Sequence, residues 1–214
     1  MTKKIIPSIL TDNPGDFKNK LRKLRGLTRE AQFDFADGRF TKSKTLDFDV
    51  LIQNKSRSIS EVHLMALNPE KYLSSARKVR IKRVIFHFEA VKSVSAVLKK
   101  IERMGLKKGL ALNLRTPVKK IRPYLNKVDL ILLMAVRVGF GGQKFSPPAL
   151  DKIKKLRAMS KKVKIEVDGG VNLSNIGKIA RAGADYFVVG VGLFGAPDVK
   201  KRFQQLKSII NAVK

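Results

Sequence analysis

The sequence contains no cysteine and no tryptophan among its 214 residues. Without cysteine the chain can form neither a disulfide bond nor a thiolate metal site, and we therefore expect a cytoplasmic location. The sequence also lacks an apolar run long enough to span a membrane. Lys3 and Lys4 are not followed by the apolar segment of a secretory signal. We expect no signal peptide and no membrane partner.

Acidic residues are scarce as well, with 17 Asp and Glu against 46 Lys and Arg and a formal net charge of +29. Such an excess attracts polyanions such as RNA. The basic residues, however, are spread along nearly every polar stretch, and neither an RNA-binding motif nor an aromatic stacking platform accompanies them. We expect no specific nucleic-acid function, only weak nonspecific binding to polyanions at low salt. A lysine-rich solvated surface explains the charge equally well.

Short apolar runs alternate with longer amphipathic segments along the whole chain, and the hydrophobic content of 43% suits one domain with a full-sized core. Eight apolar strands, each followed by a helix, favour a closed barrel over an open doubly wound sheet. We predict an α/β fold, a single (β/α)8 TIM barrel, over residues 1–214. The predicted strands are 5–9, 32–35, 61–65, 83–87, 109–112, 130–134, 164–167 and 186–189. The predicted helices are 16–24, 47–53, 69–76, 91–103, 118–124, 148–159, 174–182 and 197–213.

Three predicted strands end near residues that transfer protons or bind metals, namely Asp34, His63 and Asp168. Because the carboxyl ends of barrel strands form one active face, we expect these side chains at one mouth. Glycines at 139, 141, 142, 169, 170 and 190 follow the last three strands. They either permit tight turns or offer backbone N–H groups to an anion. The aspartates could instead cap loops, but the combination indicates acid/base chemistry on a small phosphorylated molecule.

These residues lie within a series of short motifs that runs through the chain. The motifs are Pro7-Ser-Ile-Leu10, Asp37-Gly38, Val62-His-Leu-Met65, Phe86-His-Phe-Glu-Ala90, Ala111-Leu-Asn113 with Thr116-Pro117, Gly139-Phe-Gly-Gly-Gln143, Glu166-Val-Asp-Gly-Gly-Val-Asn172, Ala182-Gly-Ala-Asp185 and Phe194-Gly-Ala-Pro197. In order and spacing they resemble the ribulose-phosphate 3-epimerase family, the ribulose-phosphate-binding barrels that epimerise ketose phosphates. No single motif carries the resemblance, which covers nearly the whole chain.

The resemblance implies that Asp34 and Asp168 are the catalytic residues. Inverting a carbon next to a ketone requires a proton to leave one face of an enediolate and another to arrive on the opposite face. Two carboxylates do this in the family. The implied enzyme is an isomerase of carbohydrate metabolism, in the pentose phosphate pathway. It epimerises carbon three of D-ribulose 5-phosphate to give D-xylulose 5-phosphate.

The family usually binds a divalent metal, often zinc, iron or manganese, which stabilises the enediolate oxygens. Its ligands are two histidines and the two aspartates, which implies Asp34, His63 and Asp168 in this chain. Gln32 stands where the family has the other histidine, in a His-x-Asp pattern. An amide oxygen is a weaker neutral ligand than imidazole for such metals. Gln32 is therefore the weak point of the implied metal site.

A phosphorylated sugar is the implied partner, with its phosphate held by backbone N–H groups of the glycine turns. At position 191 the family commonly has serine or asparagine, and Val191 retains only the backbone donor. Barrels of this family commonly associate, so a homo-oligomer is a further expectation. The implied substrate-binding residues are Ser8, His63, Gly139, Phe140, Gly141, Gly142, Gly169, Gly170, Gly190 and Val191.

Arginine also occupies unusual positions near the expected barrel mouth, at Arg39, Arg115 and Arg137. One explanation is sequence drift in an already basic protein. The other is that arginine takes over part of the electrostatic role of the metal or adapts the site to a more anionic substrate.

Two alternative functions remain open at this point. The first is epimerisation of another, six-carbon ketose phosphate. The second is a catalytically silent barrel that binds a phosphorylated ligand or a polyanion. Retention of Asp34, His63 and Asp168 favours the enzyme, whereas Gln32 and the charge of +29 favour the silent barrel.

Overall fold

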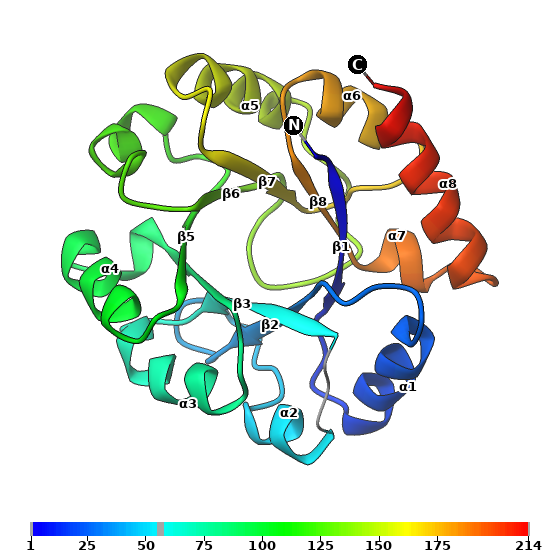
Figure 1. The fold of residues 1–214 in the computed structure, drawn as a ribbon, viewed down its shortest axis with the longest axis horizontal. Coiled ribbons are helices and arrows are strands. Elements are labelled where there is room, and N and C mark those ends of the chain that lie inside the picture. The colour runs from blue at the N-terminus through cyan, green and yellow to red at the C-terminus, as the bar shows by residue number, and fades with distance from the viewer. Residues whose placement is uncertain (1, 55–57, 214) are drawn as a thin grey trace.

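A computed structural model describes residues 2–54 and 58–213. Eight parallel strands form a closed barrel in the order β1 to β8, with β8 hydrogen-bonded to β1 (Figure 1). The predicted α/β fold, a single (β/α)8 barrel, is confirmed. The strands are β1 Lys4–Ile9, β2 Ala31–Ala36, β3 Ile59–Met65, β4 Arg83–His87, β5 Lys107–Leu112, β6 Leu130–Met134, β7 Lys164–Asp168 and β8 Tyr186–Val189.

The helices form a ring outside the barrel (Figure 1). Capping side chains define several of their first turns: Asn13 accepts a hydrogen bond from the N–H of Asp16, and Asp198 accepts one from Lys201. The α-helices are α1 Pro14–Leu24, α2 Asp49–Asn54, α3 Leu73–Lys78, α4 Val94–Arg103, α5 Pro148–Met159, α6 Ile176–Arg181, α7 Val191–Phe194 and α8 Val199–Ala212. In the described part of the chain, three 3-10 helices span Pro69–Tyr72, Phe88–Ala90 and Val118–Tyr124.

The predicted elements differ from the structure mainly in helix type and helix ends. The segment 118–124 is a 3-10 helix that contains Pro123, whose missing N–H cannot support an α-helical ladder. The predicted helix 69–76 likewise begins as a 3-10 turn and continues as α3. Helix α7 was not predicted, because a helix of four residues has no recognisable periodicity.

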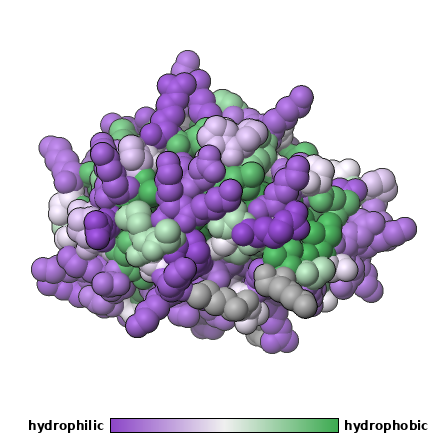
Figure 2. Space-filling model, turned by 90° about the horizontal axis from the view of Figure 1, so that it is seen from above, coloured by the Kyte–Doolittle hydropathy of each residue, from purple (hydrophilic) through white to green (hydrophobic). Residues whose placement is uncertain are grey.

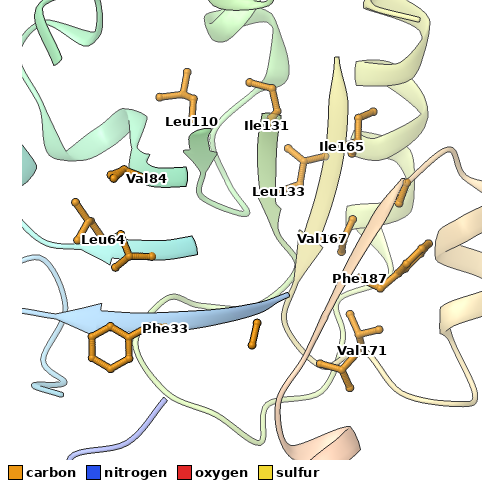
Figure 3. Packing of buried hydrophobic residues seen from close by; sticks show 14 of the residues in the cluster. Phe33, Leu64, Val84, Leu110, Ile131, Leu133, Ile165, Val167, Val171 and Phe187 are labelled. Atoms are coloured by element: carbon orange, nitrogen blue, oxygen red, sulfur yellow. The ribbon is translucent and has the colours of Figure 1, made fainter. Parts of the chain in front are cut away.

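Strand side chains alternate between two apolar layers, as the twofold repeat of a strand requires. Residues pointing out of the barrel pack against the helices, among them Phe33, Leu133 and Phe187 (Figure 3). Residues pointing inward form a smaller apolar cluster. Its buried members are Ile6, Ile85, Ala111, Leu130, Leu132, Met134, Val136 and Val188.

A polar layer lies inside the barrel near the amino-terminal ends of the strands. Arg83 of β4 donates a hydrogen bond to Glu61 of β3, and both Glu61 and Glu166 of β7 are buried. Burial, followed by repulsion from Glu61, raises the pKa of Glu166 well above its usual value.

Hydrophilic side chains cover most of the face seen in Figure 2, with smaller hydrophobic areas between them. This distribution agrees with the even spread of basic residues along the sequence. Within the described residues, no helix combines the length and the apolar character needed to cross a bilayer.

Candidate active site

Three predicted residues meet at the carboxyl ends of the strands. Asp34 and His63 are paired across β2 and β3, each two residues before its strand ends, and Asp168 is the last residue of β7. The Nδ1 atom of His63 lies 3.1 Å from Asp34 Oδ1 and 3.6 Å from Asp168 Oδ2. All three side chains are largely shielded from solvent. The barrel thereby brings together two carboxylates and an imidazole that are far apart in sequence.

Gln32 joins the same group through its amide nitrogen. Its Nε2 donates hydrogen bonds to Asp34 Oδ1 at 2.8 Å and to Asp168 Oδ2 at 3.3 Å. Its Oε1 is buried and has no hydrogen-bond partner in the described part of the chain. The amide therefore holds the two carboxylates together with a neutral donor.

The two carboxylates influence each other electrostatically. Burial raises the pKa of Asp168 to about 7, and the nearby charge of Asp34 adds to this rise, while His63 and Gln32 oppose it. Two carboxylates this close cannot both stay ionised without a compensating positive charge. The site therefore favours either a bound proton or a cation between them.

The same residues have the donor chemistry of a divalent metal site. Asp34, His63 and Asp168 each present one ligand atom, and these atoms all lie within 4.8 Å of one another. Carboxylate oxygen and imidazole nitrogen are the usual ligands of such ions, and a catalytic site often uses three protein ligands. Turning the Gln32 amide by half a rotation would direct its unpartnered Oε1 toward the group. The residues present therefore fit a metal ion.

A second histidine lies directly behind His63. The Nε2 atoms of His63 and His87 are 2.8 Å apart, and both rings are fully buried. His87 is the last residue of β4. Burial lowers the pKa of His87 to about 4, so its ring is neutral at physiological pH.

A cavity of about 550 Å³ opens above the two aspartates, a size typical of small-molecule sites. Asp34 and Asp168 both line it, whereas Gln32 and His63 are not among its lining residues. Of the predicted substrate-binding residues, only His63 lies outside the lining. The others, which do line it, are Ser8, Gly139, Phe140, Gly141, Gly142, Gly169, Gly170, Gly190 and Val191.

Two glycines of the cavity wall leave no room for a side chain. Gly170 has a φ of +67°, and a Cβ there would lie 2.3 Å from the backbone nitrogen of Phe145. A Cβ on Gly192 would lie 2.4 Å from the carbonyl oxygen of Val171. Glycine at these positions therefore lets neighbouring backbone segments pack closely at this end of the cavity, beside β7 and β8.

Several lining residues were not predicted from the sequence. Lys20 reaches the cavity from α1, and Lys144 from the long connection after β6. Met134 and Phe194 add apolar walls. Neither lysine belongs to a strand-end motif, so no signal in the sequence separated them from the many other lysines.

Of the three arginines expected near the mouth, Arg137 lines the cavity, whereas Arg39 and Arg115 do not. The nearby positive charges are therefore those of Lys20, Arg137 and Lys144. Their placement at the rim suits an anionic ligand.

Comparisons with known proteins agree with this geometry. The sequence model of the "Ribulose-phosphate 3 epimerase family" matches residues 4–194. A ribulose-phosphate 3-epimerase from Escherichia coli K12 is 35% identical, over 95% of this chain and 94% of the relative. One from Bacillus subtilis is 33% identical, over 95% of this chain and 98% of the relative. Among solved structures, a 3-hexulose-6-phosphate synthase from Salmonella typhimurium is similar with a TM-score of 0.72 at 12% identity, covering 100% of both chains; this likeness concerns the fold alone.

Proposed function

The chain belongs to the ribulose-phosphate 3-epimerase family, and we propose that it interconverts D-ribulose 5-phosphate and D-xylulose 5-phosphate by inverting carbon three. The observation that carries this proposal is the pair Asp34 and Asp168, which line one cavity from β2 and β7. The reaction would place the enzyme in the pentose phosphate pathway. The lack of cysteine remains the ground for expecting the cytoplasm.

In the proposed mechanism one carboxylate removes the proton from carbon three, and its electron pair enters an enediolate. The other group, as a carboxylic acid, delivers its proton to the opposite face of carbon three. In the reverse direction the two residues exchange roles, so no oxidant or reductant is needed. Gln32 Nε2, bonded to both carboxylates, keeps their spacing fixed.

We propose that Asp34, His63 and Asp168 hold a divalent metal, such as zinc, iron or manganese, while Gln32 keeps donating from Nε2 to the two carboxylates. When bound, the ion would supply positive charge to the developing enediolate oxygens. The cavity wall also contains Arg137, Lys20 and Lys144. Because the three metal ligands are retained, we favour a bound metal over its replacement by arginine.

The phosphate of the substrate is proposed to bind between the turns after β7 and β8. Gly170, Gly190 and Gly192 line this end of the cavity, and loops in this position commonly bind phosphate in (β/α)8 barrels. Lys20 supplies a nearby ammonium group. Ser8 lines the same region. Its Oγ lies close to Gly190, 3.1 Å from the position that a Cβ on Gly190 would occupy.

A coupled epimerase assay tests the proposal with the wild type, Asp34→Asn and Asp168→Asn. Because acid/base groups typically contribute about 100- to 10,000-fold, each substitution should lower kcat by at least about 100-fold. Asp151→Asn is a matched control, since the Asp151 side chain is 72% exposed on α5 and should leave kcat unchanged.

The assay also separates the two alternative functions. Turnover of a six-carbon ketose phosphate in preference to ribulose 5-phosphate would replace the proposed substrate. Absence of wild-type turnover with every ketose phosphate, with zinc, iron and manganese supplied in turn, would instead indicate a binding protein. The named relatives favour neither alternative.

A further inference from the structure

A line of buried polar groups leads away from the metal-binding group on the side opposite the cavity. His63 directs Nδ1 toward Asp34 and Asp168 and directs Nε2 toward His87 Nε2, 2.8 Å away. The other ring nitrogen of His87, Nδ1, faces Glu89 Oε2 at 3.5 Å. Glu89 belongs to the 3-10 helix that follows β4. These contacts connect a proposed metal ligand to a carboxylate that does not line the cavity.

The surroundings of His87 Nδ1 consist of hydrogen-bond acceptors. Glu89 Oε2 and Asn113 Oδ1 are both buried and lack a geometrically complete hydrogen bond among the described residues. The Asn113 side chain interacts with His87, as Glu89 does. The 3.5 Å separation from Glu89 would close to a hydrogen bond with a slight rotation of either side chain.

Glu89 is held as an ionised acceptor. Burial alone would raise the pKa of Glu89, but hydrogen bonds from His87, Thr116 and the Asn113 backbone together lower it. The Asn113 N–H donates to Glu89 Oε1 at 2.9 Å. An ionised Glu89 can only accept hydrogen bonds, so it demands a proton on His87 Nδ1.

With an ion bound at His63 Nδ1, this demand fixes the proton positions along the whole line. A neutral imidazole carries one N–H and one lone pair. With its proton on Nδ1, His87 offers the lone pair of Nε2, so the short contact requires His63 to donate from its own Nε2. The lone pair of His63 is then on Nδ1, which faces the two aspartates. The reverse arrangement would set the lone pair of His87 Nδ1 against the Glu89 carboxylate.

We infer that His87 and Glu89 are positioning residues that, in the metal-bound protein, hold His63 with Nδ1 unprotonated and aimed at the metal position. This inference rests on the proposed function, because it concerns how the same site acquires its metal. A metal-bound histidine commonly has its second nitrogen fixed by a hydrogen bond, and such partners strengthen metal affinity. A lone pair placed between two carboxylates also requires a cation there.

Nitrogen-15 NMR of the histidine rings tests the proton positions directly. The chain has two histidines, so the spectrum contains two rings, and His87→Gln identifies which signals belong to His87. In the wild-type protein loaded with Zn²⁺, we expect the proton of His87 on Nδ1 and that of His63 on Nε2. A proton on His87 Nε2 would overturn the inference, whatever the metal affinity.

Zinc affinity, measured by competition with a chelating indicator, tests the consequence. His87→Leu removes the acceptor for His63 and should weaken Zn²⁺ binding about 10- to 100-fold. His87→Gln keeps an acceptor oxygen near the former Nε2 and should stay within about 3-fold of the wild type. Equal affinities for wild type and His87→Leu would contradict the inference, as would equal losses in both variants.

Neither measurement depends on the identity of the sugar phosphate. A protein that fails to turn over ribulose 5-phosphate yet shows the expected ring protonation would refute the proposed function and leave the positioning role intact. If His87→Leu does not fold, as far-ultraviolet circular dichroism would reveal, the wild-type NMR spectrum still decides the question.

Discussion

Gln32 is the residue at which this site differs most from the expected set of ligands. Its Nε2 donates to Asp34 and Asp168, the two proposed catalytic residues, so the amide acts here as a donor and not as a ligand. A histidine at this position would offer a lone pair to a metal but would not keep both hydrogen bonds to the carboxylates. Gln32 thus holds Asp34 and Asp168 at a fixed spacing, but we expect it to support weaker metal binding than a histidine would.

The substitution Gln32→His should therefore tighten metal binding. We expect Zn²⁺ affinity to rise at least about 10-fold, because an imidazole is a better ligand than an amide oxygen for this ion. Chelator competition measures the affinity, and Gln53→His, on the exposed surface of α2, controls for a histidine added elsewhere. An unchanged affinity in Gln32→His would mean that position 32 does not face the ion.

At the scale of single residues, the sequence identified those residues that residue type and position in a strand-end motif distinguish. Asp34, His63 and Asp168 were found because each lies near the end of a predicted strand. The contact between His63 and His87 was not, because two neighbouring strands set it and the direction of the hydrogen bonds depends on Glu89. Lys20 was not predicted for another reason, since the sequence does not distinguish it from the many surface lysines.

The strands were more predictable than the helices. Buried parallel strands are apolar on both faces, so β4, β6 and β8 have the residue ranges that the pattern predicted. Short 3-10 segments and the four-residue α7 have no comparable periodicity. The barrel order follows from alternation of strand and helix, whereas the polar layer of Glu61, Arg83 and Glu166 requires the closed barrel to bring the three together.

That polar layer leads to a prediction on stability and pH. Burial raises the folded-state pKa of Glu166, so its protonated form stabilises the protein at low pH and this contribution is lost as pH rises through the raised pKa. Glu166→Gln keeps a donor toward Glu61 without ionising. Its unfolding free energy relative to wild type should therefore increase from pH 5 to pH 8, by at most about 1.4 kcal/mol per pH unit.

Urea unfolding in the presence of a chelator, which removes any effect of bound metal, measures this difference. Glu102→Gln is the control, since the Glu102 side chain is 64% exposed in its ion pair with Lys108 and such pairs contribute little. A difference between wild type and Glu166→Gln that stays constant with pH would show that Glu166 does not titrate in this range.

For the molecule as a whole, the fold follows from the order of its motifs, but the role of its charge does not. A charge of +29 distributed over the surface produces a long-range attraction for anions, and only the folded barrel shows which cations lie at the cavity. Weak polyanion binding and homo-oligomer formation remain predictions at this scale. The more specific consequence concerns the capture of an anionic substrate.

If the net charge steers the sugar phosphate into the cavity, kcat/KM should fall several-fold as ionic strength rises from about 10 to about 300 mM, while kcat changes little. Lys144→Ala should flatten this salt dependence, because Lys144 lines the cavity. Lys161→Ala provides the matched control, since exposed Lys161 precedes β7 at the opposite end of the barrel. Initial rates at several salt concentrations measure both slopes. Equal slopes in the two variants would assign the attraction to the net charge alone, and a flat wild-type profile would exclude steering.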